Sequence, residues 1–67
     1  MNLALELAYL ATSEDAGERH AIRASIPQGT CIPYQGVYDQ IIALTPLAPT
    51  PSRQAVWKER VRGFVEY

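Results

Sequence analysis

The segment Asn2-Leu-Ala-Leu-Glu-Leu-Ala-Tyr-Leu-Ala-Thr12 is apolar on nearly every face of the helix that it predicts. It consists mainly of strong helix formers, and Asn2 is placed to cap the first turn. A leucine stripe recurs at i, i+4 and i+7, a row of alanines lies beside it, and Leu5 and Tyr9 occupy a further face. A helix of this kind is buried on more than one side. We expect the rest of so short a chain to leave part of it uncovered.

The length of 67 residues predicts one small domain that spans residues 1–67. The hydrophobic content of 48% argues against disorder. A lone core of this size supplies only about 3–5 kcal/mol, so such chains usually need an additional stabilising device. Cys31 is the only cysteine and His20 the only other soft ligand, so we expect no intrachain disulfide, no structural zinc and no cofactor. The remaining stabilising devices are good packing and association with a second copy of the chain.

A second helix is expected from Glu14 to about Ser25, opened by Ser13, because acidic residues gather at its start and basic residues at its end. Residues 26–29 are expected to form a turn, with proline in its second position and glycine in its fourth. A hairpin that pairs residues 21–26 with residues 30–32 through this turn stays open as an alternative.

A third helix is expected over about residues 34–44, and its wide apolar face favours it as the central core element. Residues 45–52 contain three prolines and predict an extended strap, with Leu47 packed back onto the core. Thr50 or Ser52 then caps a last helix. The apolar stripe expected on that helix consists of Trp57, Val61, Phe64 and Val65. Together these elements predict a mainly α fold, a compact array of three or four short helices with a Pro-rich extended strap before the last helix.

The net charge of −1 gives the chain no strong long-range field toward nucleic acid or anionic lipid. Its longest apolar stretch, residues 3–11, is interrupted by Glu6 and is too short to span a bilayer. No basic region precedes this stretch, as a secretory signal would require. The absence of an export signal and the single cysteine favour a cytoplasmic location, and no membrane partner is expected.

His20 and Cys31 are the only pair of residues that suits nucleophilic catalysis, which needs a thiolate activated by an adjacent imidazole. We interpret His20 as a solvated helix residue and Cys31 as a small buried hydrophobe. The four glycines are isolated and form no phosphate-binding loop. The sequence therefore does not predict an enzyme.

Surplus apolar helix surface is typical of interaction sites, and tyrosines are frequent among the residues that dominate protein interfaces. The sequence therefore predicts a small non-catalytic protein-interaction module, an adaptor, inhibitor or regulator that binds a larger protein. Self-association through the first helix, to give a homodimer, is a further expectation. The predicted protein-binding residues are Leu3, Leu5, Leu7, Tyr9, Leu10, Tyr34 and Tyr38.

Two alternative functions remain open at this point. Residues 53–62 carry four cations against Glu59, a local net charge of +3, and a helix with this charge is suited to docking on phosphates. A nucleic-acid-binding regulator would use Arg53, Lys58, Arg60 and Arg62. A small structural subunit of a larger assembly would instead be poorly folded alone and become ordered with its neighbours.

Overall fold

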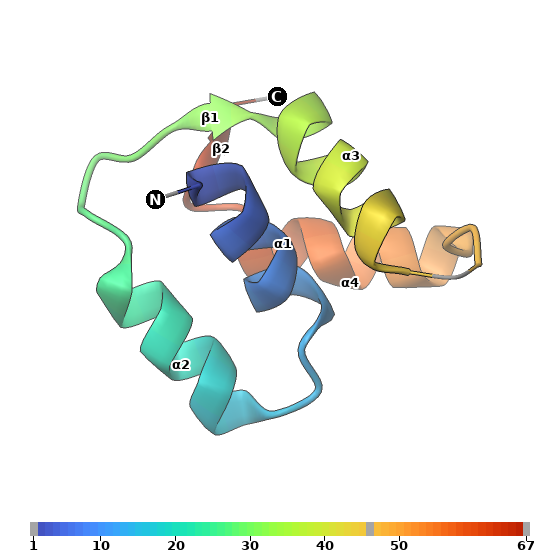
Figure 1. Ribbon diagram of the computed structural model, residues 1–67, viewed down its shortest axis with the longest axis horizontal. Coiled ribbons are helices and arrows are strands. Elements are labelled where there is room, and N and C mark those ends of the chain that lie inside the picture. Colours follow the sequence, from blue (N-terminus) through green and yellow to red (C-terminus); the bar gives the residue numbers. More distant parts are fainter. Residues whose placement is uncertain (1, 46, 67) are drawn as a thin grey trace.

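The first helix lies at the centre of the molecule, and the other helices surround it (Figure 1). The computed structural model describes residues 2–45 and 47–66. Within these ranges α1 spans Leu3–Thr12, α2 Ala16–Ser25, α3 Tyr34–Leu44 and α4 Pro51–Val61. α1 packs against α2, α3 and α4, whereas no other two helices of the described residues share a contact of comparable extent. The predicted mainly α array with an extended strap before its last helix is confirmed.

The expectation that residues 34–44 form the central core element is wrong, because α1 has that position. α3 buries only Val37 and Ile41 completely. α1 buries two leucines together with Ala8 and Ala11, and such small side chains allow neighbouring helices to approach closely on more than one side. Among the described residues the buried core consists of Leu7, Ala8, Leu10, Ala11, Ile26, Val37, Ile41, Trp57, Val61 and Val65.

Local capping interactions begin two helices where the sequence predicts them. The side-chain Oδ1 of Asn2 accepts a hydrogen bond from the Leu5 amide at 3.1 Å, which satisfies one of the free amides in the first turn of α1. Thr50 acts in the same way on α4, where its Oγ1 accepts from the Arg53 amide at 3.2 Å. Pro51 is the first residue of α4, a position where the missing amide hydrogen is not needed.

The second helix begins later than expected. Asp15, not Ser13, is its N-cap, and Oδ1 of Asp15 accepts from the Gly17 amide at 2.9 Å. Ser13 ends α1 instead, with its own amide donating to the carbonyl of Tyr9 at 2.9 Å. The helix runs on to Ser25, so the alternative hairpin over residues 21–32 does not form.

The turn after α2 is displaced by one residue from the predicted position. The Thr30 amide donates to the Pro27 carbonyl at 3.2 Å, so the turn covers residues 27–30. Gly29 has φ of +82° at the third position, which is the place where a type II turn requires glycine. The glycine therefore fixes the register of this turn.

Two short strands join the middle of the chain to its end. β1, Ile32–Pro33, pairs in parallel with β2, Val65–Glu66, and Ile32 lies opposite Val65. Because α4 ends at Val61, Phe64 and Val65 do not belong to a helical stripe as predicted, although both contribute to the core. Ile32 packs against the core and successive side chains of a strand point to opposite sides, which explains why the preceding Cys31 is exposed rather than buried as expected.

Arginine side chains hold the ends of helices that are far apart in sequence. Nη1 of Arg60 on α4 donates to the carbonyls of Ala11 and Ser13, at 2.7 and 3.2 Å, where α1 ends. Arg19 on α2 also donates to the Ser13 carbonyl, at 2.6 Å. Arg23 in turn donates to the carbonyl of Arg60, at 2.7 Å, near the end of α4. Carbonyls at the end of a helix lack intrahelical donors and carry partial negative charge, so a guanidinium stabilises them.

The strap does not cover the core in the predicted way. Leu47 is 80% exposed, so the expectation that it packs back onto the core is wrong. It lies at a shallow hollow that it shares with Pro49 and the nearly buried Trp57, and the indole already fills this side of the core. No helix among the described residues has both the length and the apolarity to cross a membrane.

The neighbouring residues Ile41 and Ile42 allow a matched test of this core. Ile41→Val should lower the free energy of unfolding by about 1 kcal/mol, and Tm by about 4–8 °C, because it removes a methylene from a fully buried site. Ile42 is on the same helix but 41% exposed, and Ile42→Val should leave Tm nearly unchanged. Thermal unfolding followed by circular dichroism measures both variants, and equal shifts would contradict the described core.

The arginine contacts give a second prediction about stability. Arg60→Met keeps the aliphatic stem but removes the guanidinium that donates to the Ala11 carbonyl at the end of α1, so it should cost about 1 kcal/mol or more. Arg62→Met removes a charge whose only partner among the described residues is the exposed Glu59, 3.6 Å away, and should change stability by less than about 0.5 kcal/mol. Urea unfolding compares the two, and a loss in Arg62→Met as large as that in Arg60→Met would be inconsistent with the capping role.

Candidate functional site

An open groove with a volume of about 480 Å³ lies between α1 and α2. Its lining combines three apolar side chains with two carboxylates and one amide. The lining residues are Asn2, Leu5, Glu6 and Tyr9 from α1 and its cap, and Glu18 and Ile22 from α2. No lysine, arginine or histidine is among them.

Helical spacing explains why these side chains face one another. Leu5 and Tyr9 are four residues apart on α1, as are Glu18 and Ile22 on α2, so each pair lies on one face of its helix. α2 itself has no fully buried residue and meets the core through the partly buried Ile22. The contact between the two helices therefore contains no fully buried side chain from α2, and Tyr9 remains 44% exposed.

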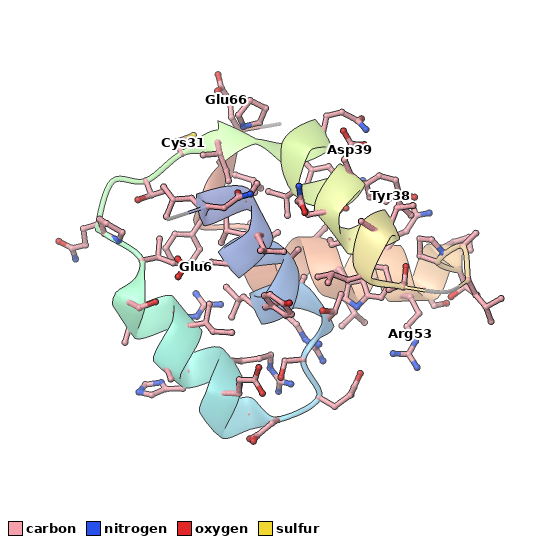
Figure 2. The ribbon with its side chains drawn as sticks, viewed as in Figure 1. Glu6, Cys31, Tyr38, Asp39, Arg53 and Glu66 are labelled. Atoms are coloured by element: carbon pink, nitrogen blue, oxygen red, sulfur yellow. The ribbon has the colours of Figure 1, made fainter. Side chains whose placement is uncertain are left out.

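The acidic side of the groove contains a carboxylate oxygen that is shielded from solvent. Oε2 of Glu6 is buried, and no donor within residues 2–45 or 47–66 forms a hydrogen bond with it. Figure 2 shows Glu6 directed from α1 toward the α2 side of the molecule. Burying a carboxylate oxygen without a donor is unfavourable, so positive charge placed close to Glu6 in the groove would be favourable.

The predicted protein-binding residues on α1 have different environments. Leu5 and Tyr9 lie in the groove, as expected for a contact face. Leu7 and Leu10 are 0% and 1% exposed, so their inclusion in a binding surface is wrong. Their stripe faces α1's own helical neighbours, which use it for the core. Leu3 is half-buried and does not line the groove.

Tyr34 and Tyr38 belong to a separate region, since α3 lies on the opposite side of α1 from α2 (Figure 1). Their rings are in contact, with centroids 5.8 Å apart. Nζ of Lys58 lies 5.3 Å from the centroid of the Tyr34 ring, and Nε2 of Gln54 donates to the Tyr38 hydroxyl at 3.4 Å. These tyrosines thus join α3 to α4, and the seven predicted residues do not form one surface.

The cations predicted for nucleic-acid binding are engaged within the chain. Arg53 lies 3.3 Å from the Glu14 carboxylate, and Arg62 pairs with Glu59. Arg60 donates to the end of α1, and Lys58 lies over the Tyr34 ring. The two ion pairs are exposed and weak, but a phosphate that approached either arginine would also meet its carboxylate. The local charge of +3 therefore does not form a free cationic face.

Three further hollows offer less to a partner than the groove. One, of about 560 Å³, lies at Pro33, Tyr34, Gln35 and Glu66, and its Tyr34 is already engaged by Lys58. Another is the hollow at Leu47, of about 340 Å³, where no charged side chain other than the paired Arg53 is present. The third, also of about 340 Å³, lies around Val56, and its charged residues have partners within the chain: Arg53 pairs with Glu14, and Arg60 donates to the end of α1.

The residues considered for catalysis are both on the surface. His20 is an exposed residue of α2, as expected, and Cys31 is exposed before β1. Among the described residues no three His, Cys, Asp or Glu side chains are grouped in a way that could hold a metal ion. The side chains that line the groove offer apolar contact, hydrogen bonding and negative charge.

Sequence reasoning missed four of the six residues that line the groove, namely Asn2, Glu6, Glu18 and Ile22. Glu6 carries a recognisable signal, since it is the one charged residue in an otherwise apolar helical segment. Glu18 and Ile22 have the i, i+4 spacing of one helix face. Their approach to α1 depends on how α2 folds back, which no local pattern specifies.

The groove is characterised by its own residues: apolar contact surface from two helices, two carboxylates and no cation in its lining. Comparisons of the chain with models of protein families, with curated proteins and with solved structures give no match.

Proposed function

We propose that this protein is a small non-catalytic protein-interaction module, an adaptor, inhibitor or regulator, that binds a larger protein through the groove between α1 and α2. The observation that carries the proposal is the position of Tyr9, a large aromatic side chain left 44% exposed beside Leu5 and Ile22 in a concave surface. Tyrosine buries a large area on binding while its hydroxyl keeps a polar partner, which is why it is frequent at interface hot spots.

The form of the groove supports a protein ligand. Two neighbouring helices with apolar side chains between them create the kind of surface into which an amphipathic helix binds. The groove is open to solvent rather than enclosed, so it suits a segment of another protein better than a small substrate. In this function α3 and α4 support α1 from the other sides and keep Leu5 and Tyr9 in place.

The other two functions are less well supported. A nucleic-acid-binding regulator needs free cations, and those of residues 53–62 have partners within the chain. A structural subunit that folds only with its neighbours is difficult to reconcile with a core of ten buried apolar residues supplied by one chain. We also propose a cytoplasmic location, because an exposed, unpaired thiol such as that of Cys31 persists more readily in a reducing compartment.

Substitutions at two residues with similar exposure, Tyr9 and Ile42, test the proposal. Immobilised wild-type chain should capture a specific protein from a native lysate, and Tyr9→Ser should reduce the amount captured at least about tenfold, because Tyr9 supplies the central contact. Ile42 is 41% exposed but lies on α3, so Ile42→Ser should capture as much as the wild type.

Circular dichroism is needed to show that both variants remain folded. An interaction through this groove would be refuted if Tyr9→Ser and Ile42→Ser reduced the amount of captured protein equally. It would also be refuted if neither variant reduced it. The absence of any protein captured above the background of a blank resin would also count against the proposed function.

A further inference from the structure

The carboxylates of the groove differ in their surroundings from three other carboxylates, which have cations or amides as partners. Glu14 and Glu59 lie beside Arg53 and Arg62, and Asp15 accepts hydrogen bonds from the first amides of α2. Glu6 and Glu18 instead border a surface whose lining contains no cation. The groove is therefore both apolar and negatively charged.

Of the two glutamates that line the groove, Glu6 contributes more than Glu18 to the selection of a ligand. One of its oxygens is shielded from water and receives no hydrogen bond from the described residues. A ligand that brings an ammonium or guanidinium group into the groove gains a charge-assisted hydrogen bond with the part of the Glu6 carboxyl group that lines it. A ligand with a neutral or acidic group at the same place gains less or is repelled.

The apolar residues beside Glu6 define the rest of the ligand. Leu5, Tyr9 and Ile22 offer contact to aliphatic side chains and to the hydrocarbon stem of lysine or arginine, whose charged end then reaches the carboxylates. A helix presents apolar and basic residues together on one face when they are three or four positions apart. The groove thus matches a segment that is basic and amphipathic at once.

A second copy of this chain is a poorer occupant. In a symmetric dimer the same surface meets itself, so Glu6 and Glu18 would face their equivalents across the interface. Like charges brought together in this way oppose association. The chain's own basic helix, α4, is engaged with α1, with Tyr34 and with its own acidic partners.

We infer that the groove between α1 and α2 binds a basic amphipathic helical segment of another protein, with a lysine or arginine paired to Glu6 and apolar residues packed on Leu5, Tyr9 and Ile22. This inference depends on the proposed function and adds the chemical class of the partner. It assigns to Glu6 the role of selecting for positive charge.

The test uses the full chain and three synthetic helical peptides of equal length. All three contain leucine on one face, and they differ only in the residue placed beside the leucines: lysine, glutamine or glutamate. In amide NMR titrations the lysine peptide should shift the signals of Leu5, Glu6, Tyr9, Glu18 and Ile22. The glutamine peptide should bind about tenfold more weakly and the glutamate peptide should not bind, because only the first supplies a cation.

Substitutions at two glutamates separate a specific contact from general attraction. Glu6→Gln should weaken binding of the lysine peptide about tenfold and leave the glutamine peptide unaffected. Glu59→Gln removes the same charge from an exposed site on α4 and should change neither affinity. An equal loss in both variants would overturn the inference, since it would indicate attraction by net charge alone.

The remaining outcomes distinguish the inference from the function on which it depends. Equal binding of the lysine and glutamine peptides in the groove would refute selection for positive charge but support an interaction groove. If none of the peptides shifts signals of the groove, both the inference and this groove as the binding surface are refuted. Shifts of the groove signals with concentration of the protein alone would identify a second copy as the occupant and would also overturn the inference.

Discussion

The burial of α1 by three other helices is the interaction on which the whole structure depends. α2, α3 and α4 each pack on α1, and no other two helices in the described part of the chain have a contact of similar extent. A helix that is apolar nearly all round is stable in water only when it is covered on several sides. The chain covers α1 with three helices, and their contacts bury most of the apolar surface that a lone α1 would expose to water.

What remains uncovered on α1 is the strip next to α2 that holds Leu5 and Tyr9, and α2 has no fully buried residue that would close this strip. α2 buries no residue completely and is attached to the core through Ile22 and, just beyond its end, Ile26. Arg19 and Arg23 add hydrogen bonds to carbonyls near the ends of α1 and α4. Glu18 and Ile22 of α2 and Leu5 and Tyr9 of α1 therefore line a groove that is left open for other contacts.

The use of arginine within the fold also determines which charges are available to a partner. Arg60 is part of the contact between α4 and α1, and Arg53 and Arg62 are each balanced by a neighbouring carboxylate. The acidic residues Glu6 and Glu18 have no such balance in the lining of the groove. A sequence that is nearly neutral as a whole thus presents a locally negative, apolar surface.

The local patterns of the sequence determined the helices, because caps and helical propensity act over a few residues: Asn2 and Thr50 begin their helices as expected, and Tyr34–Leu44 has the predicted bounds. Only the tertiary structure decided which helix is central, that residues 32–33 pair with residues 65–66, and that Leu47 stays exposed. For the candidate site, the surplus apolar face of the first helix was enough to predict Leu5 and Tyr9. Only the tertiary structure decided that Leu7 and Leu10 are buried and that Tyr34 and Tyr38 lie on another side of the molecule (Figure 1). Periodicity states which residues of a helix share a face, but the neighbour that covers this face is chosen by contacts between distant segments, and these leave no local pattern in the sequence.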